Sequence, residues 1–387
     1  MAVEKHRPKK QKSKPEKGIQ EIEIPEEADE DGLCHLRIDI RRALPGRRLD
    51  KYLAGRLGRF SRTALQQYIR EGAVTVNGKV VKPSYTIQTG DVIEMLLPEP
   101  EEQIIEPEPI PLEIIYEDDD IIVINKQAGL IVHPAKGNPS GTLLNALAYH
   151  LQSSKASNEH AIDLDDLPDR GDKCRAGIVH RLDKDTTGVM VLAKSELALW
   201  RLGRQFELRR VHKTYRAIVH GLVELDEDVI DAPIGAHPHI RERYAVRYST
   251  EKDISLSPSG KQISKPAITR YRVLERLSHT GCIAGGFTFI ELYPKTGRTH
   301  QLRVHMSFIG HPIVGDRTYG GGPIYQSQLD GVNDQAYGPI ITRQALHAAV
   351  IEFQHPRTLK MVRFEAPLPE DFRSALKALN SKMVDNL

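Results

Sequence analysis

The chain has few cysteines and no long apolar segment. Its 387 residues include only three cysteines, Cys34, Cys174 and Cys282, which lie far apart. Isolated cysteines argue against a disulfide framework or a thiolate metal cage and suit a reducing compartment. No run of about 18 apolar residues is present, which argues against a membrane-spanning helix. The polar first ten residues do not have the form of a secretory signal. We therefore expect a cytoplasmic protein.

The sequence also lacks the motifs of several common active sites. Sixteen histidines are present, but the pairs His237/His239 and His300/His305 do not have the i, i+4 spacing that places two metal ligands on one helical face. We therefore predict no metal site. The absence of a glycine-rich phosphate loop argues against phosphoryl transfer. No motif places a histidine base beside Cys174, so this thiol is a poor candidate nucleophile.

The net charge of +2 hides a strong segregation of charge near the start of the chain. Seven basic residues lie between Lys5 and Lys17, and seven acidic residues follow between Glu21 and Asp31. Few large apolar residues are present to offset the entropy of ordering this segment. We therefore predict that residues 1–32 form a disordered charged tail. Its basic part could contact phosphates without sequence preference, or it could be only a solvated tail.

A small α+β unit is predicted after this tail. Apolar alternation predicts a strand over residues 36–40, and helical patterns cover residues 47–57 and 62–71, the second between an N-cap at Ser61 and a terminating glycine. Asn77-Gly78 between β-branched runs predicts a hairpin, and a strand over residues 92–97 closes the unit. Its many arginines and lysines indicate a module that docks on nucleic acid.

The motifs Arg48-Leu-Asp-Lys, Ser61-Arg62 and Ile69-Arg-Glu-Gly-Ala-Val-Thr-Val-Asn-Gly78 resemble the small RNA-binding domain first known from ribosomal protein S4. We therefore assign an S4-like RNA-binding domain to residues 33–97. The residues that we predict to contact RNA in it are Arg48, Arg62, Arg70 and Lys79. Residues 98–111 are rich in proline and glutamate and are predicted to be an extended linker.

We assign the rest of the chain, residues 112–387, to one domain. Its most informative feature is a polar segment between two apolar runs. The runs Gly177–Val179 and Val189–Ala193 are predicted to be strands, and His180–Gly188 connects them. A loop fixed by buried strands is a common place for chemistry. A carboxylate beside Arg181 and a lysine should be ionised at neutral pH. The alternative is a charged turn with no role in chemistry.

The remaining pattern predicts a mixed α+β domain with a largely antiparallel sheet, because strands are many, helices are few and βαβ alternation is absent. A hairpin is predicted over residues 112–125, and helices over residues 142–151, 195–210 and 297–306 and after Pro369. Residues 153–173 are predicted to be a polar insertion and residues 235–265 a basic loop region. The side chains predicted to face inward from the helix after Ser195 are Leu197, Trp200, Leu202 and Phe206.

Three residue types stand out as candidates for chemistry: Asp183, Tyr215 and an arginine, Arg298 or Arg303. Arginine can hold a carboxylate in place. A tyrosine offers a surface on which a base can stack and a hydroxyl that can assist proton transfer. A hydrolase using Asp183 and Asp185 is a weaker hypothesis, because residues two apart in a strand point to opposite sides. Asp185 is instead predicted to accept hydrogen bonds from the following backbone amides.

Five ordered blocks resemble the signature of the RluA-type pseudouridine synthases, and the resemblance covers about residues 45–370. The blocks are Ala176-Gly-Ile-Val-His-Arg-Leu-Asp-Lys-Asp-Thr-Thr-Gly188, Arg209-Arg-Val-His-Lys-Thr-Tyr215, Gly297-Arg-Thr-His-Gln-Leu-Arg-Val-His305, His311-Pro-Ile-Val-Gly-Asp316 and Gln344-Ala-Leu-His-Ala348. With the S4-like module and the segment Tyr116–Lys126, the chain is most similar to the branch of this family that modifies large-subunit ribosomal RNA, the RluD type.

The resemblance implies that the chain isomerises uridine in RNA to pseudouridine without a cofactor. Asp183 would be the essential carboxylate, attacking ribose C1′ or uracil C6 or abstracting a ribose proton. Tyr215 would stack on the uracil and could act as a base at C5. Arg303 would form an ion pair with Asp183, with Arg298 nearer the RNA phosphates. Arg181 could fill the space that the flipped uridine leaves in its helix.

The resemblance also implies further contacts and a partner. Ile178 and Leu302 are predicted to line the base pocket, and His180 to lie in the RNA-binding site. The partner would be large-subunit ribosomal RNA or a pre-ribosomal particle, and we expect a monomer. A second hypothesis is an RNA-binding ribosome assembly factor whose catalytic activity is secondary or lost. The intact set of Asp183, Tyr215 and Arg303 favours the enzyme.

Overall fold

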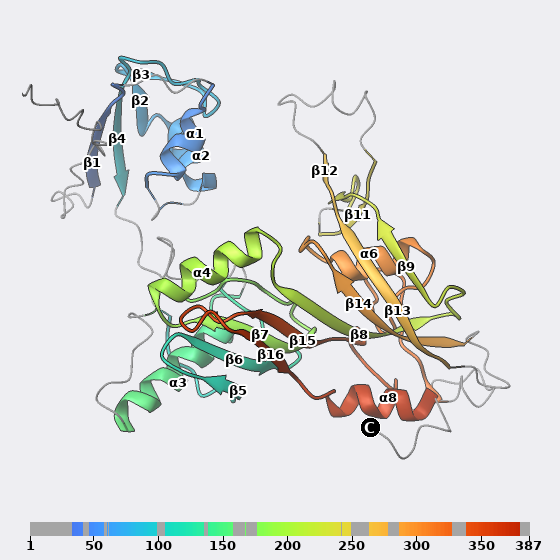
Figure 1. Cartoon of the computed structure of the whole chain (residues 1–387). Coiled ribbons are helices and arrows are strands. Elements are labelled where there is room, and N and C mark those ends of the chain that lie inside the picture. Colours follow the sequence, from blue (N-terminus) through green and yellow to red (C-terminus); the bar gives the residue numbers. More distant parts are fainter. Residues whose placement is uncertain are drawn as a thin grey trace, which may run out of the picture. The chain divides into compact units, whose positions relative to one another are not determined.

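The fold is described from a computed structural model of the chain. The described residues are 33–41, 46–57, 60, 62–98, 105–134, 138–157, 167, 176–240, 242–248, 263–277, 286–326 and 338–379. The predicted tail, Ser61, Cys174 and most of the predicted insertion lie outside them. The chain divides into two compact units, Met1–Glu102 and Gln103–Leu387 (Figure 1). Within the described part, no helix is both long and apolar enough to cross a membrane.

The first unit is a four-stranded antiparallel sheet with two helices. The sheet has the order β1 (Leu33–Asp39), β4 (Val92–Pro98), β2 (Val74–Val76), β3 (Lys79–Val80), and the helices are α1 (Leu49–Ala54) and α2 (Arg62–Glu71). Asn77 and Gly78 have positive φ angles of 51° and 71°, as the predicted two-residue hairpin requires. Leu53 and Ile69 are fully buried between helices and sheet, so this unit has its own apolar core.

The second unit is built on one large sheet with nine strands among the described residues. Eight follow the order β5 (Glu113–Glu117), β6 (Ile121–Lys126), β7 (Thr187–Ala193), β15 (Leu346–Gln354), β8 (His212–His220), β14 (Phe287–Pro294), β13 (Ile268–Leu277), β9 (Glu227–Asp231), and β16 (Met361–Glu365) pairs with β15. Among the strand pairs of this sheet that the structure describes, β7 with β15 is parallel and the others are antiparallel. The prediction of a mixed α+β fold with a largely antiparallel sheet is confirmed.

Part of the region predicted to be a basic loop is in fact strand. A small sheet has the order β11 (Tyr244–Val246), β10 (Ile234–Ala236), β12 (Ser264–Lys265). The strands are only two or three residues long, so they carry too few alternating positions for a periodic pattern to show.

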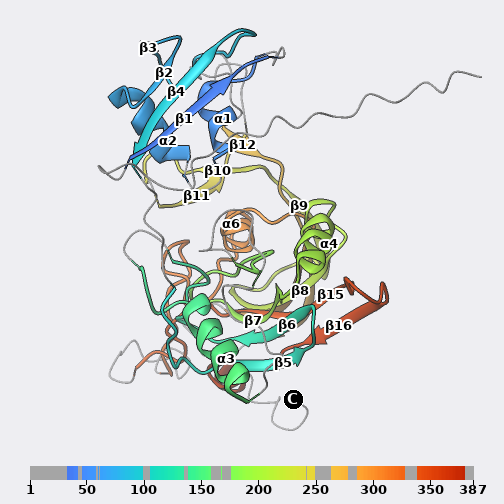
Figure 2. The same ribbon diagram turned by 90° about the vertical axis from the view of Figure 1, so that its left-hand side faces the viewer.

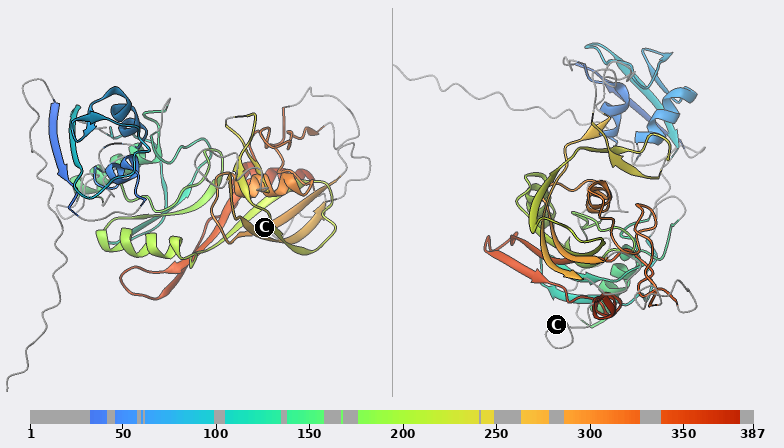
Figure 3. Two further views of the ribbon diagram at one scale, coloured as in Figure 1. Left: turned by 90° about the horizontal axis from the view of Figure 1, so that it is seen from above. Right: turned by 90° about the vertical axis from the view of Figure 1, so that its right-hand side faces the viewer.

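Among the described residues, four helices pack on the large sheet: α3 (Leu143–Ser157), α4 (Glu196–Glu207), α6 (Gln301–Phe308) and α8 (Glu370–Leu379). Figure 2 and Figure 3 show α6 on the concave side of the curved sheet. Helix α3 continues to Ser157, so the start of the predicted insertion is helical. In α4 the prediction of the inward face is wrong in part, because Trp200 is 66% exposed and Ala198 and Leu199 are buried instead.

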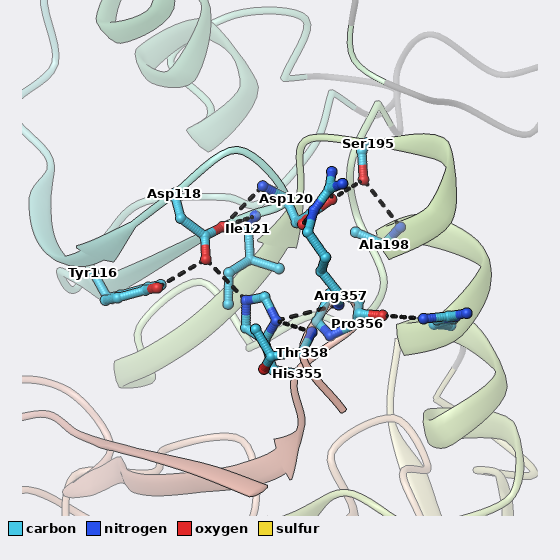
Figure 4. Close-up of polar contacts among 11 residues, drawn as sticks. Tyr116, Asp118, Asp120, Ile121, Ser195, Ala198, His355, Pro356, Arg357 and Thr358 are labelled. Atoms are coloured by element: carbon cyan, nitrogen blue, oxygen red, sulfur yellow. Dashed lines mark hydrogen bonds and ion pairs between the residues drawn. The ribbon is translucent and has the colours of Figure 1, made fainter. Parts of the chain in front are cut away.

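The central strand β7 is buried along its whole length. Both of its faces are covered, so its sequence is a continuous apolar run instead of an alternating one. A polar cluster holds the end of the β7–α4 connection (Figure 4). Ser195 accepts a hydrogen bond from the amide of Ala198 and donates to Asp120, which also binds Arg357. The β5–β6 turn, the start of α4 and the β15–β16 turn are therefore fixed to one another.

Candidate active site

The loop that carries Asp183 is fixed by glycines at both ends. Gly177 has a φ of +67°, and a Cβ on it would lie 2.5 Å from the carbonyl oxygen of Ala193. Gly188 has a φ of +114°, and its Cβ would lie 2.2 Å from the carbonyl oxygen of Ala348. Larger residues would clash with the neighbouring backbone. The predicted strand 177–179 is not formed, since only Ile178 makes an isolated bridge, to Leu192.

Arg303 on α6 holds the carboxylate of Asp183. Its Nη1 atom donates a hydrogen bond of 3.2 Å to Oδ2 of Asp183. The other side of the guanidinium binds Asp316 through Nε (2.6 Å) and Nη2 (2.8 Å). Asp316 is almost fully buried, whereas the side chain of Asp183 is 21% exposed. The predicted pair of Asp183 and Arg303 is therefore present, and a second, buried carboxylate orients the arginine.

His300 and Tyr319 complete the surroundings of this ion pair. Nε2 of His300 lies 4.0 Å from Oδ2 of Asp183, and its Nδ1 lies 2.7 Å from the Tyr319 hydroxyl. Burial lowers the pKa of His300 despite the nearby Asp183 carboxylate. The guanidinium of Arg303 lies 5.1 Å from the centre of the Tyr319 ring. At neutral pH His300 is therefore uncharged, and the cation that hydrogen-bonds Asp183 is Arg303.

Tyr215 comes from the centre of the sheet. It lies on β8, opposite Ala348 of β15 and Leu292 of β14. Burial, and then the charge of Asp183, raise the pKa of its hydroxyl. The phenol is therefore neutral at pH 7. Lys213, two residues earlier on the same face of β8, has a pKa lowered by burial.

These side chains line one cavity of about 460 Å³. The predicted site residues that line it are Asp183, Tyr215, Arg303, Arg181, Leu302, Arg298 and His180. Ile178 does not line it; this residue packs against the apolar core instead. Residues from three segments far apart in the sequence are thus brought to one site, with an ionisable carboxylate, an aromatic ring and guanidinium groups around a space for a ligand.

His180 has a structural environment within this wall. Its Nε2 accepts a hydrogen bond of 3.1 Å from the amide of Val191, and its ring stacks on Phe206 at 4.7 Å. Burial, with a smaller effect of the Lys213 charge, lowers the pKa of His180 to about 3. The imidazole is therefore neutral and is not a cationic ligand for phosphate.

The basic residues predicted to bind RNA in the first unit fall into two groups. Arg48 and Arg62 both bind the buried carboxylate of Asp50, with shortest distances of 3.0 and 2.6 Å. Arg70 and Lys79 are exposed and make no ion pair with the residues that the structure describes. The first two arginines therefore stabilise the unit itself, whereas the second two have no such partner in the described part of the chain.

Two residues important for the site were not found from the sequence. Asp316 lies in one of the recognised blocks, but nothing local shows that it binds Arg303. Lys126, at the end of a buried apolar strand, is fully buried and donates hydrogen bonds to the carbonyl oxygens of Gln127, Leu130 and Lys184. The sequence did contain one indication of this role: a lysine at the end of an apolar strand is expected to be buried, and a buried charge needs hydrogen-bond partners.

The prediction for Asp185 is wrong. Asp185 does not accept hydrogen bonds from the following amides within the described residues; its own carbonyl accepts one of 3.2 Å from Arg343. Among the described residues, no group of three or more histidine, cysteine or acidic side chains is arranged to hold a metal ion.

Comparisons with known proteins identify the class. Residues 120–308 match the family model of the RNA pseudouridylate synthases, and residues 47–93 match the S4 domain. The chain is 40% identical to an uncharacterized RNA pseudouridine synthase, YlyB, of Bacillus subtilis, over 86% of this chain and 94% of that one. The chain therefore belongs to the RNA pseudouridine synthase family, whose members are isomerases.

Other relatives are named as a specific enzyme of this family. The chain is 39% identical to ribosomal large subunit pseudouridine synthase D of Pasteurella multocida, over 89% of this chain and 95% of that one. Among solved structures, human RNA pseudouridylate synthase domain containing 4 matches with a TM-score of 0.49 and 26% identity, over 69% of this chain and 92% of that one. The predicted family and the S4 domain are confirmed.

Proposed function

We propose that this protein converts specific uridines of large-subunit ribosomal RNA to pseudouridine, with Asp183 as the essential carboxylate. The observation that carries the proposal is the position of Asp183 at the cavity wall, bound on one side by Arg303 while its side chain is still partly exposed. An ionised carboxylate that is fixed but accessible can attack a substrate or take a proton from it. Its relatives named ribosomal large subunit pseudouridine synthase D support the choice of RNA.

The reaction breaks the bond between uracil N1 and ribose C1′ and forms a bond between C5 and C1′. The C5 hydrogen leaves as a proton and N1 gains a proton, so the atoms balance without an oxidant or a second substrate. Asp183 can serve by attacking C1′ or C6 or by abstracting a ribose proton. In each case Arg303 stabilises the carboxylate form of Asp183 before and after the step.

The aromatic and aliphatic residues of the cavity fit a uracil ring. Tyr215 offers a face for stacking, and Leu302 contributes an apolar wall. A base must leave its helix to enter such a cavity. Arg181 is exposed at the cavity wall, where it can occupy the space that the uridine leaves. The RNA-binding roles of Arg298 and His180 are less direct, since Arg298 binds the carbonyl of Pro266 and His180 is neutral.

The S4-like unit, proposed as residues 33–97, supplies a separate RNA contact through Arg70 and Lys79. We propose that the protein acts as a monomer in the cytoplasm on ribosomal RNA or a pre-ribosomal particle. The competing idea of an assembly factor without catalysis gains no support from the site, because Asp183, Tyr215 and Arg303 line a single cavity.

The test uses tritium release from large-subunit ribosomal RNA that is transcribed with uridine labelled at C5. Asp183→Asn keeps the shape of the side chain but removes its charge, and should lower the rate by at least about 10³-fold. Asp119→Asn changes an exposed carboxylate outside the site and is the matched control. Filter binding should show the same RNA affinity for all three proteins. Normal tritium release by Asp183→Asn would refute the role of Asp183, and none from the unchanged protein would refute the proposed function.

A further inference from the structure

Asp183 borders two cavities. The first is the cavity that contains Tyr215. A second cavity, also of about 460 Å³, is lined by residues 315–318 and 342–344, and its wall includes Asp183 and Arg303 as well. The two spaces therefore meet at the proposed reacting group.

The two linings differ in chemistry. The first contains the rings of Phe206 and Tyr215 and the side chains of Val211, Leu302 and Leu346. The second contains the cations of Lys184, Arg317 and Arg343 and the hydroxyls of Thr318 and Thr342, together with the carboxylates of Asp185 and Asp316. Asp316 is already paired with Arg303. Cations also border the first cavity, and His300 borders both, but the rings of Phe206 and Tyr215 border the first cavity and not the second. These two rings offer the larger surface on which a base can stack.

Four polar side chains of the second cavity have no partner among the described residues. Lys184 and Arg317 are exposed, and neither forms an ion pair with any residue in the described ranges. The hydroxyls of Thr318 and Thr342 have no hydrogen-bond partner within the same ranges. This contrasts with Arg303, which is bound by two carboxylates. Free cations and hydroxyls beside a reaction centre suit an anion with several acceptor oxygens.

We propose that this second cavity, the phosphate cavity, holds the phosphodiester backbone next to the target uridine, bound by Lys184 and Arg317. The inference rests on the proposed function and deepens it. The bond to be broken joins the base to the ribose, so a carboxylate that acts there must have the base on one side and the sugar–phosphate on the other. Asp183 lies between the cavity that contains Tyr215 and the cavity that contains the unpaired side chains of Lys184 and Arg317, and this position meets the requirement.

The test measures kcat and KM for tritium release from C5-labelled large-subunit ribosomal RNA over a range of salt concentrations. Arg317→Gln and Lys184→Gln should each raise KM by about tenfold at moderate salt, because a charge-assisted hydrogen bond is lost. A contact made equally in the ground and transition states leaves kcat unchanged. A plot of log(kcat/KM) against log salt has a negative slope, and this slope should become shallower by about one unit in each variant.

Two further variants make the result specific. Arg317→Lys keeps the charge and should restore the salt slope. Lys360→Gln removes an exposed lysine in the β15–β16 turn and should behave as the unchanged protein. All variants should melt at the same temperature, since the side chains replaced have no ion-pair partners in the described part of the chain.

Other results would overturn the proposal. An unchanged salt slope in Arg317→Gln and Lys184→Gln would do so. A slope that changes only in Lys295→Gln would do so as well, because Lys295 borders the first cavity. A loss in kcat alone would mean that the variants disturb the loop of Asp183. If the unchanged protein releases no tritium, the proposed function fails, but the salt slopes of RNA binding, measured in the same variants, still decide whether this cavity binds phosphate.

Discussion

Asp316 binds Arg303 through two parallel hydrogen bonds, of 2.6 and 2.8 Å, and leaves one guanidinium nitrogen for Asp183. The geometry of the proposed reacting carboxylate therefore depends on a residue that does not touch the cavity holding Tyr215. A bidentate pair fixes the plane of the guanidinium as well as its position.

We expect Asp316→Asn to lower kcat by about 10- to 100-fold while the RNA affinity stays the same, because Arg303 loses its fixed orientation. Asp371→Asn is the matched control, since Asp371 binds Arg343 in the same bidentate way, at 2.7 and 2.8 Å. It should lower the melting temperature without a comparable loss of kcat. Equal losses of kcat in the two variants would indicate general destabilisation and contradict the positioning role. Single-turnover rates and filter binding provide the measurements.

The features predicted best are those that the local sequence determines. The hairpin at Asn77-Gly78 needs only two residues that tolerate positive φ, and both have it. The partners of Arg303 and Lys126 are different, because Asp316 lies 13 residues from Arg303, and Lys184 lies 58 residues from Lys126. Such pairs form only when the sheet brings their segments together. In the sequence, the family resemblance was the only indication that Asp183, Tyr215 and Arg303 share a site.

Helix α4 shows how a periodic pattern can mislead. Leu197 and Trp200 form one apolar stripe, and Ala198, Leu199 and Leu202 form another, beside it. The helix buries the second stripe and exposes Trp200. Hydrophobicity alone favoured the larger side chains, but the buried face is set by the sheet on which the helix packs. Periodicity therefore predicted the helix but not its rotation.

Replacing Tyr215 with phenylalanine tests whether the reaction needs the tyrosine hydroxyl in addition to the aromatic ring. Tyr215→Phe should bind RNA with the same affinity, because the stacking surface remains, but should lower kcat by about 10²-fold or more if the hydroxyl transfers the C5 proton. Since the pKa of this hydroxyl is raised by burial and by Asp183, a phenolate forms only at high pH. The rate of the unchanged protein should therefore rise with pH above neutrality, and the rise should be absent in Tyr215→Phe. An unchanged kcat would limit Tyr215 to stacking.

Because Lys126 is buried, we expect the free energy of unfolding to depend on pH. Burial, only partly offset by the charges of Asp185 and Asp183, lowers its pKa from 10.5 to about 8. Between these two pH values the unfolded chain binds more protons than the folded chain, so the contribution of Lys126 to stability should increase as the pH rises through this window. Urea unfolding of the unchanged protein and of Lys126→Met, from about pH 7 to about pH 10, measures the difference.

At neutral pH, Lys126→Met should still lower the free energy of unfolding by about 2 kcal/mol or more, since three carbonyl oxygens, that of Leu130 buried and the other two partly buried, lose their donor. The variant should also lower kcat, because one of these carbonyls belongs to Lys184, next to Asp183. A difference between the two proteins that stays constant with pH would show that the ammonium group does not titrate in this window.

The buried carboxylate of Asp50 in the first unit separates arginines that stabilise the unit from Arg70, which we propose to bind RNA. Burial alone would raise the pKa of Asp50, but hydrogen bonds from Arg48, Arg62 and Gln66 lower it well below its ordinary value of 3.8. The stability that these bonds give is present above that value and is lost as the pH falls below it.

Asp50→Asn should therefore lower the free energy of unfolding of this unit by about 2 kcal/mol at neutral pH, and the difference from the unchanged protein should shrink in acid. By the same argument, Arg62→Gln should lower the melting temperature of the unit. Arg70→Gln should leave the melting temperature unchanged and should instead reduce the salt dependence of RNA binding by about one unit of slope, because its side chain is exposed and free to bind phosphate. The opposite assignment, with Arg62→Gln stable and Arg70→Gln unfolding, would contradict the division of these arginines into two groups.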